Sequence, residues 1–331
     1  MTATPPIRLI DLGQTGAVRT QAVYHAVARL TSAASPDTVI LARPAEPYLC
    51  IGYHQSVHDH LDLAACRARD LPIVRRSIGG GTTYLDRDQL FYQFVFHRSR
   101  VPATAGRMYA YLLKVPEQTL LSLGFAAALR GEQELEVAGR RIAGIGGGWI
   151  GESAVLVGNF LLDFDFAALV RVWASPWPAY RELAAEALAD SLITLWSLNP
   201  GLAMSRVAEA FSAILPAALK RTVLPGSLTA QDDDLAGSLG LEMTAKSYLE
   251  EMGPANGALP RPLKIAAGLT IHAETWTGAG LNYRAALRVR DGIIEEGRIE
   301  QQVARGWSTV ELPVAGSAYP RWRERLEAAH A

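Results

Sequence analysis

The chain has 331 residues, 49% hydrophobic and 20% charged, with a net charge of −1. This length allows one large domain or two, and the near-zero charge argues against a nucleic-acid-binding protein. We expect no signal peptide, because the first seven residues lack a basic and an apolar region, and no membrane span, because no apolar run approaches about 18 residues.

The first hundred residues alternate between helical and strand patterns. Residues 17–32 carry apolar side chains at helical spacing and predict an amphipathic helix. Residues 62–69 predict a second, shorter helix. Strands are predicted at residues 38–41, 48–51, 71–76 and 90–97.

The middle of the chain continues this mixture. Residues 104–123 predict a helix that breaks or kinks at Pro116, and Ala138-Gly139 predicts a hairpin turn between residues 135–137 and 141–143. A strand at 155–164 and helices at 184–196 and 206–215 follow. Mixed elements of this kind indicate an α+β or α/β architecture.

The composition changes at residues 222–262, where proline, glycine and aspartate accumulate around a predicted helix at 243–251. Strands at 263–275, 284–289 and 293–301 follow, the last two joined by Asp291-Gly292, a strong hairpin signal. A helix is predicted at 319–329. We therefore expect a main domain at 1–225, a linker with a helix at 226–257 and a small domain at 258–331.

The most informative stretch is Arg75-Arg76-Ser77-Ile78 followed by Gly79, Gly80 and Gly81. Three consecutive glycines remove every side chain and cost backbone entropy. They suit a ligand lying against bare backbone, and arginine supplies forked donors for carboxylate or phosphate. A glycine hairpin beside surface arginines is the alternative interpretation.

This stretch, followed by Asp86, resembles the signature of the lipoate–protein ligase and octanoyltransferase family, which is related to the biotin–protein ligases. Further segments resemble the family in the same order, at residues 8–11, 47–55, 139–144 and 158–165. The resemblance covers residues 5–230. A biotin ligase is disfavoured, because its Gly-Arg-Gly-Arg run is absent.

The resemblance implies an α+β fold, with a biotin/lipoate ligase-like catalytic domain whose mixed, largely antiparallel sheet is flanked by helices. The small C-terminal α+β domain resembles the accessory domain of bacterial lipoate–protein ligases; an unrelated module is the alternative. The implied reaction uses ATP with Mg²⁺ to convert lipoate or octanoate into an acyl-adenylate. The acyl group then passes to a lysine of a lipoyl-domain acceptor protein.

Two alternatives stay open for this activity. One is a catalytically weak homologue that binds acyl groups or lipoyl proteins, and the other is an ATP-independent octanoyl or lipoyl transferase. We expect a cytoplasmic protein, because its two cysteines provide no disulfide framework, and we expect it to be a monomer.

Arg141 is the critical site residue that the resemblance implies, because it occupies the position of the family's catalytic lysine. Arginine keeps the charge but is a planar fork that cannot transfer protons at neutral pH. Other departures are Gln133-Glu134 in place of Asn-Asp and Leu85 in place of His, and we interpret them as a retuned pocket. The implied acyl- and nucleotide-binding residues are Arg75, Arg76, Gly79, Gly80, Gly81, Thr82, Asp86, Glu134, Gly139, Ile142, Ala143 and Gly144.

Three other features of the sequence are candidates for chemistry. Cys50 and Cys66 do not match the thioester positions of the family, expected near 145–155 or 170–175, and are interpreted as small buried hydrophobic residues. His54, His58 and His60 predict a solvated loop rather than a zinc site. The glycine-rich residues 145–151 predict a loop, which either orders over a ligand or stays unligated.

Overall fold

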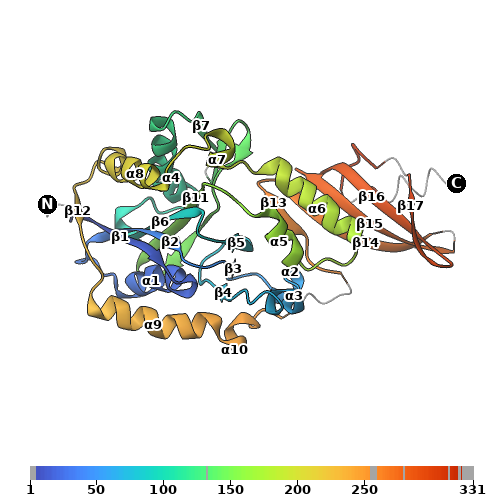
Figure 1. The fold of residues 1–331 in the computed structure, drawn as a ribbon, viewed down its shortest axis with the longest axis horizontal. Helices are drawn as coiled ribbons and strands as arrows, with labels where there is room; N and C mark the ends of the chain where they lie inside the picture. Colours follow the sequence, from blue (N-terminus) through green and yellow to red (C-terminus); the bar gives the residue numbers. More distant parts are fainter. Residues whose placement is uncertain are drawn as a thin grey trace. The chain divides into compact units, whose positions relative to one another are not determined.

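The computed structural model describes residues 5–131, 133–253, 259–278, 280–311, 314–319 and 322. Packing divides the chain into two compact units (Figure 1). Unit 1 consists of residues 1–55, 67–165 and 192–252, and unit 2 of residues 56–66, 166–191 and 253–331. The packing thus differs from the predicted boundaries: residues 226–252 pack with unit 1, whereas 56–66 and 166–191 pack with unit 2.

Unit 1 is built on a six-stranded sheet in the order β10-β11-β6-β2-β1-β12. Strands β10, β11, β6 and β2 pair antiparallel, whereas β2, β1 and β12 are parallel. The predicted mixed, largely antiparallel sheet is confirmed. The strands are β1 (Ile7–Thr15), β2 (Asp37–Pro44), β6 (Gln89–His97), β10 (Ile145–Ile150), β11 (Ser153–Leu161) and β12 (Val223–Pro225).

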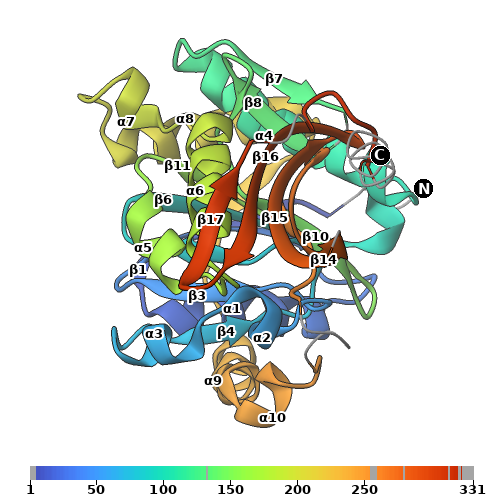
Figure 2. The same ribbon diagram turned by 90° about the vertical axis from the view of Figure 1, so that its right-hand side faces the viewer.

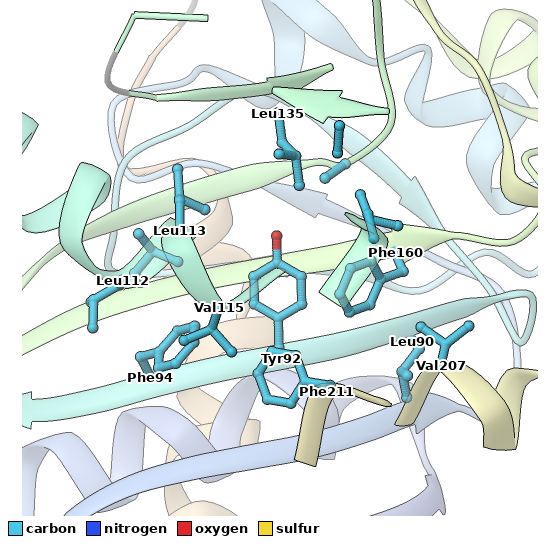
Figure 3. Close-up of a cluster of buried hydrophobic side chains, with 14 of the residues drawn as sticks. Leu90, Tyr92, Phe94, Leu112, Leu113, Val115, Leu135, Phe160, Val207 and Phe211 are labelled. Carbon is cyan, nitrogen blue, oxygen red and sulfur yellow. The ribbon is translucent and has the colours of Figure 1, made fainter. Parts of the chain in front are cut away.

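Helices cover both faces of this sheet, because its central strands are apolar on both sides. On β6, Tyr92 and Phe94 join a core with α4 (Ala105–Ser122) and α8 (Met204–Leu219). Phe91 and Val95 face the other side and pack with α1 (Ala17–Leu30) and α9 (Ala230–Thr244). In Figure 3, Tyr92 lies among hydrocarbon side chains with its hydroxyl directed toward Leu135.

Two three-stranded sheets complete unit 1 and carry the segments singled out by sequence. The order β4-β3-β5 places β3 (Tyr48–Ile51) between β4 (Ile73–Arg75) and β5 (Thr83–Leu85). The order β7-β8-β9 joins β7 (Ala127–Arg130), β8 (Glu134–Val137) and β9 (Arg140–Arg141). Ala138 and Gly139 both have positive φ, 52° and 72°, which confirms the predicted turn.

Several other local predictions are confirmed and several are wrong. Helix α4 runs through Pro116 without a break, and residues 145–150 form strand β10, not a loop. The helix predicted at 184–196 is α6 (Pro178–Ser191), followed by the short α7 (Leu195–Leu198). The segment predicted as one helix at 243–251 contains the last residues of α9 and the short helix α10 (Lys246–Leu249).

Unit 2 contains a five-stranded antiparallel sheet, β13 to β17 in chain order, whose later strands lie side by side in Figure 2. Asp291-Gly292 forms the predicted hairpin, with φ of 48° and 81°. The strands are β13 (Leu263–Ala266), β14 (Leu269–Gly278), β15 (Leu281–Arg290), β16 (Ile293–Val303) and β17 (Gly306–Val310).

The remaining helices are short, apart from α6 in unit 2. They are α2 (Val57–His60), α3 (Leu63–Arg67), the 3₁₀ turn η1 (Arg98–Arg100) and α5 (Phe166–Val172). The helix predicted at 319–329 lies almost wholly outside the described residues. Among the residues that are described, no helix is long and apolar enough to cross a membrane.

Candidate functional site

The loop of residues 76–82, here called the glycine loop, is organised by the buried side chain of Arg76. Its Nε donates to the carbonyl oxygen of Gly79 at 3.2 Å, and its Nη2 donates to that of Gly81 at 2.7 Å. Its Nη1 reaches Cys50 Sγ at 3.3 Å. The guanidinium group therefore shapes the loop from inside.

Arg75 has a similar internal role and is fully buried. Its Nη1 donates to the carbonyl oxygens of Tyr53 and Gln55 at 2.9 and 2.8 Å, and its Nη2 donates to Leu249 O at 2.5 Å. Burial lowers the pKa of Arg75, the opposing contributions from Tyr248, Glu251 and Tyr53 being smaller. The alternative of surface arginines is therefore wrong, and both arginines hold the backbone around the glycine loop.

Ser77 is the second residue of the glycine loop and is held from two sides. Its amide donates to His25 Nε2 at 2.9 Å, and its hydroxyl lies 3.0 Å from the hydroxyl of Tyr248. The other ring nitrogen of His25 lies 2.7 Å from Gln21 O, so the neutral ring donates there and accepts from Ser77. Burial lowers the pKa of His25 to about 4, which keeps the ring neutral.

The glycines let two backbone segments approach each other. Gly79 N donates to Gly147 O at 3.2 Å, and a Cβ on Gly146 would lie 2.8 Å from Gly79 O. Gly80 has φ of +113° and its Cβ would lie 2.5 Å from Arg76 Nη2, whereas a Cβ on Gly81 would meet nothing within 4 Å. Gly80 therefore serves the loop conformation, and Gly81 borders open space.

A chain of hydrogen bonds joins two of the predicted site segments. Gly144 N donates to Asn159 Oδ1 at 2.7 Å, and Asn159 Nδ2 donates to Gln89 Oε1 at 2.5 Å. Gln89 Nε2 in turn reaches Asp86 Oδ1 at 3.4 Å. Burial raises the pKa of Asp86, against the smaller lowering effect of the hydrogen bond from the Asp88 backbone amide.

Sequence reasoning missed Asn159 and Gln89 as members of this chain. Both are buried polar residues inside apolar strands. A polar side chain in such a run needs a partner, and that signal could have identified them.

Arg141 pairs with Glu134 across the β8–β9 hairpin, at 3.7 Å between Nη1 and Oε1. Its side chain is about a quarter exposed, yet its Nε is buried without a hydrogen-bond partner among the described residues. Burial lowers the pKa of Arg141, and Glu134 counteracts this. The arrangement is a cation with one unused donor.

The other predicted site residues divide into three kinds. Ile142 and Ala143 are fully buried in the core beside α4, so their side chains do not line a polar site. Thr82 donates to Gln55 Oε1 at 2.9 Å and closes the loop. Gly139 lies in the exposed hairpin turn.

The cysteines are buried as predicted, each about 1% exposed. Burial raises the pKa of Cys50, against the smaller opposing effect of Arg76. His54 and His58 are exposed as predicted, but His58 and His60 lie in helix α2 and not in a loop, and His60 is buried. All four lysines of the chain are exposed, at positions 114, 220, 246 and 264.

Comparison with known proteins identifies a match over residues 19–215 to the model of the lipoyl protein ligase A/B catalytic domain. An octanoyltransferase LipM from Symbiobacterium thermophilum is 28% identical over 257 residues, which cover 70% of this chain and 93% of that protein.

Solved structures show the same fold. A bipartite lipoate protein ligase from Thermoplasma acidophilum, studied with its E2 lipoyl domain, has a TM-score of 0.68 at 18% identity. The superposition covers 74% of this chain and 96% of the Thermoplasma chain. A lipoate-protein ligase A bound with ATP has a TM-score of 0.63 at 17% identity. That superposition covers 74% of this chain and 98% of the ligase chain.

Proposed function

Since the chain belongs to the lipoyl protein ligase A/B catalytic domain family, we propose that it activates lipoate or octanoate with ATP. The acyl-adenylate would then react with a lysine of a lipoyl-domain acceptor protein. The ε-amino nitrogen forms an amide bond to the acyl carbon, AMP leaves with the electrons of the broken acyl–phosphate bond, and the amine loses its proton. A cytoplasmic monomer stays part of this proposal.

The observation that carries the proposal is the unused donor of Arg141. A buried N–H without an acceptor is costly, about 1–3 kcal/mol, and an anionic ligand would satisfy it. Forming an adenylate brings a carboxylate next to a phosphate, so fixed positive charge is required there. Glu134, at 3.7 Å, keeps the guanidinium oriented.

The glycine loop supplies the second element of the proposed site. Gly80 and Gly81 are exposed, and Gly81 borders open space. Arg75 donates through both Nη atoms, and Arg76 through Nε and Nη2, to backbone carbonyl groups, so we assign them to holding this wall, although Arg75 Nε, like Arg141 Nε, is buried without a partner among the described residues. An acyl chain would then lie against bare backbone rather than against the arginines.

Mg²⁺ would enter with the nucleotide in this scheme. The described part of the chain contains no group of three or more histidine, cysteine or acidic side chains that could hold a metal ion. Mg²⁺ is commonly held by one or two carboxylates together with substrate phosphates. The carboxylate of Asp86 is of the type that fits this role, and the ion would neutralise phosphate charge.

A second candidate is ATP-independent octanoyl transfer, which the name of the Symbiobacterium relative favours. A cysteine thioester on the enzyme requires an accessible thiolate, and both cysteines are buried. Under this candidate the acceptor lysine would attack an octanoyl thioester donor directly, releasing the donor's thiol.

One experiment separates the candidates. A lipoyl-domain acceptor is incubated with the protein and either octanoate, ATP and Mg²⁺, or octanoyl-loaded acyl carrier protein without ATP. We expect the acceptor mass to increase by one octanoyl group in the first mixture. An increase in the second mixture alone supports direct transfer, and an increase in neither supports a binding protein.

Substitution of Arg141 tests the assignment of the cation. Arg141→Ala should weaken binding of octanoyl-adenylate in calorimetry, whereas Arg140→Ala, on the exposed neighbour in β9, should not. Arg141→Lys should raise the acylation rate by about a hundredfold, since a misplaced donor costs on the order of 3 kcal/mol in the transition state. Loss of activity in Arg141→Lys would instead indicate a pocket rebuilt around arginine.

A further inference from the structure

We propose that α9 and α10 position the glycine loop, with Tyr248 as the positioning residue that contacts it. This inference rests on the proposed function, because it assigns the effect to acyl binding. Residues 230–249 lie beyond the 19–215 range that matches the family model. The C-terminal helices of unit 1 would thus contribute to a site otherwise formed by the matched segment.

Two polar contacts link α10 to the start of the loop. The Tyr248 hydroxyl lies 3.0 Å from the Ser77 hydroxyl, and the carbonyl oxygen of Leu249 accepts from Arg75 Nη2 at 2.5 Å. The guanidinium carbon of Arg75 also lies 6.0 Å from the centre of the Tyr248 ring, within range of a cation–π contact. Burial raises the pKa of Tyr248, the hydrogen bond to Ser77 opposing it, so the hydroxyl stays protonated.

The base from which α10 projects is firmly packed. Leu239 and Met243 of α9 are buried in the core shared with α1, and a Cβ on Gly240 would lie 3.0 Å from Val18. Thr229 and Asp232 form a capping box at the start of α9. Such a cap typically contributes about 1 kcal/mol. Helix α9, from which α10 continues, is therefore fixed to α1.

Ser77 is where α1 and α10 meet the loop. His25 of α1 accepts from its amide, and Tyr248 of α10 contacts its hydroxyl. The three glycines that follow have no side chains, so contacts at Ser77 and Arg76 contribute to fixing their position, together with the hydrogen bond from Gly79 N to Gly147 O. Loss of the Tyr248 hydroxyl should loosen the wall against which the acyl chain lies, without touching the reacting atoms.

The test is Tyr248→Phe, which removes one oxygen and keeps the ring packing. With octanoate varied at saturating ATP and acceptor, we expect KM to rise about tenfold, equivalent to one hydrogen bond, with kcat within about twofold. Ser77→Ala should have the same effect, and the double variant should be no worse than either. Tyr111→Phe is the matched control, since that hydroxyl has no hydrogen-bond partner among the described residues.

An unchanged KM in Tyr248→Phe, or fully additive effects of the two substitutions, would overturn the proposal. Amide hydrogen exchange at residues 77–81 provides a readout that does not depend on activity. Exchange there should be faster in Tyr248→Phe than in Tyr111→Phe. If the parent protein acylates no acceptor, the proposed function fails, and exchange still decides the role of Tyr248.

Discussion

The glycine loop of unit 1 and the α6-covered sheet of unit 2 both depend on arginine, but in opposite surroundings. Arg75 and Arg76 are almost completely buried and donate to backbone carbonyl groups. In unit 2, Arg288 contacts Asp190 at 2.8 Å and Arg298 contacts Glu182 at 3.4 Å. Those two acidic side chains are more than half exposed.

The same residue type can therefore hold buried backbone in one conformation or pair with exposed acidic side chains. A buried guanidinium that loses its acceptors, or carbonyls that lose their donor, incur the full desolvation cost. An exposed ion pair is screened by water and salt and typically contributes less than about 1 kcal/mol. Each prediction below tests one side of this comparison.

Arg76→Met should have the largest effect, because it leaves the carbonyl groups of Gly79 and Gly81 without their donor. We expect the free energy of unfolding to fall by about 4 kcal/mol in urea titrations. The control is Arg206→Met on α8, whose side chain is 65% exposed, and which should change little. Equal, small losses in both variants would remove the structural role of Arg76.

Acid should destabilise unit 1 through His25, whose pKa is about 4 in the folded protein against an ordinary 6.5. Between these values the unfolded chain binds more protons, so stability falls as the pH is lowered through this window. The loss should reach about 3 kcal/mol. His25→Gln should flatten the dependence of stability on pH, whereas His58→Gln, on an exposed residue, should leave it steep.

Gly80→Ala and Gly81→Ala should separate loop conformation from ligand contact. At Gly80, a φ of +113° and the 2.5 Å approach to Arg76 make a side chain strained, and we expect a loss of about 2 kcal/mol. Gly81→Ala should leave the melting temperature nearly unchanged, because its Cβ meets open space. A larger loss at Gly81 than at Gly80 would contradict the loop geometry.

Arg298→Gln should have the smallest effect, since Glu182 and Glu186 are exposed. We expect a loss below about 1 kcal/mol that shrinks further in 1 M salt, where screening acts over about 3 Å. Thermal unfolding at low and high salt measures it. A loss that does not depend on salt would indicate a packing role for the arginine stem.

Local signals could be interpreted from the sequence alone. Ala138-Gly139 and Asp291-Gly292 form their predicted turns, with positive φ at each residue. Such a turn is determined locally, by its two central residues and the strands on either side. The helix predicted at 17–32 follows from the spacing of its own apolar residues. The order of the family-like segments also led to the correct fold.

Contacts distant in sequence could not be predicted in this way. The glycines of β10 are typical of a loop, yet a Cβ on Gly147 would collide with Tyr109 and with Val155 O, which only the fold brings close. Helix α9 has linker composition, but its Ala236 and Leu239 are buried against α1. Likewise, the sequence could not show that Arg75 donates to the carbonyl groups of Gly52 and Gln55, in the segment that follows β3.

Tyr92 and Gly158 have a consequence for how this sequence can diverge. A Cβ at position 158 would lie 2.4 Å from the phenol of Tyr92, whose hydroxyl has no hydrogen-bond partner among the described residues. Tyrosine at 92 therefore forbids any side chain at 158, whereas glycine at 158 tolerates a smaller residue at 92. The two positions are epistatic, and the order of change is fixed: position 92 must shrink before position 158 can leave glycine.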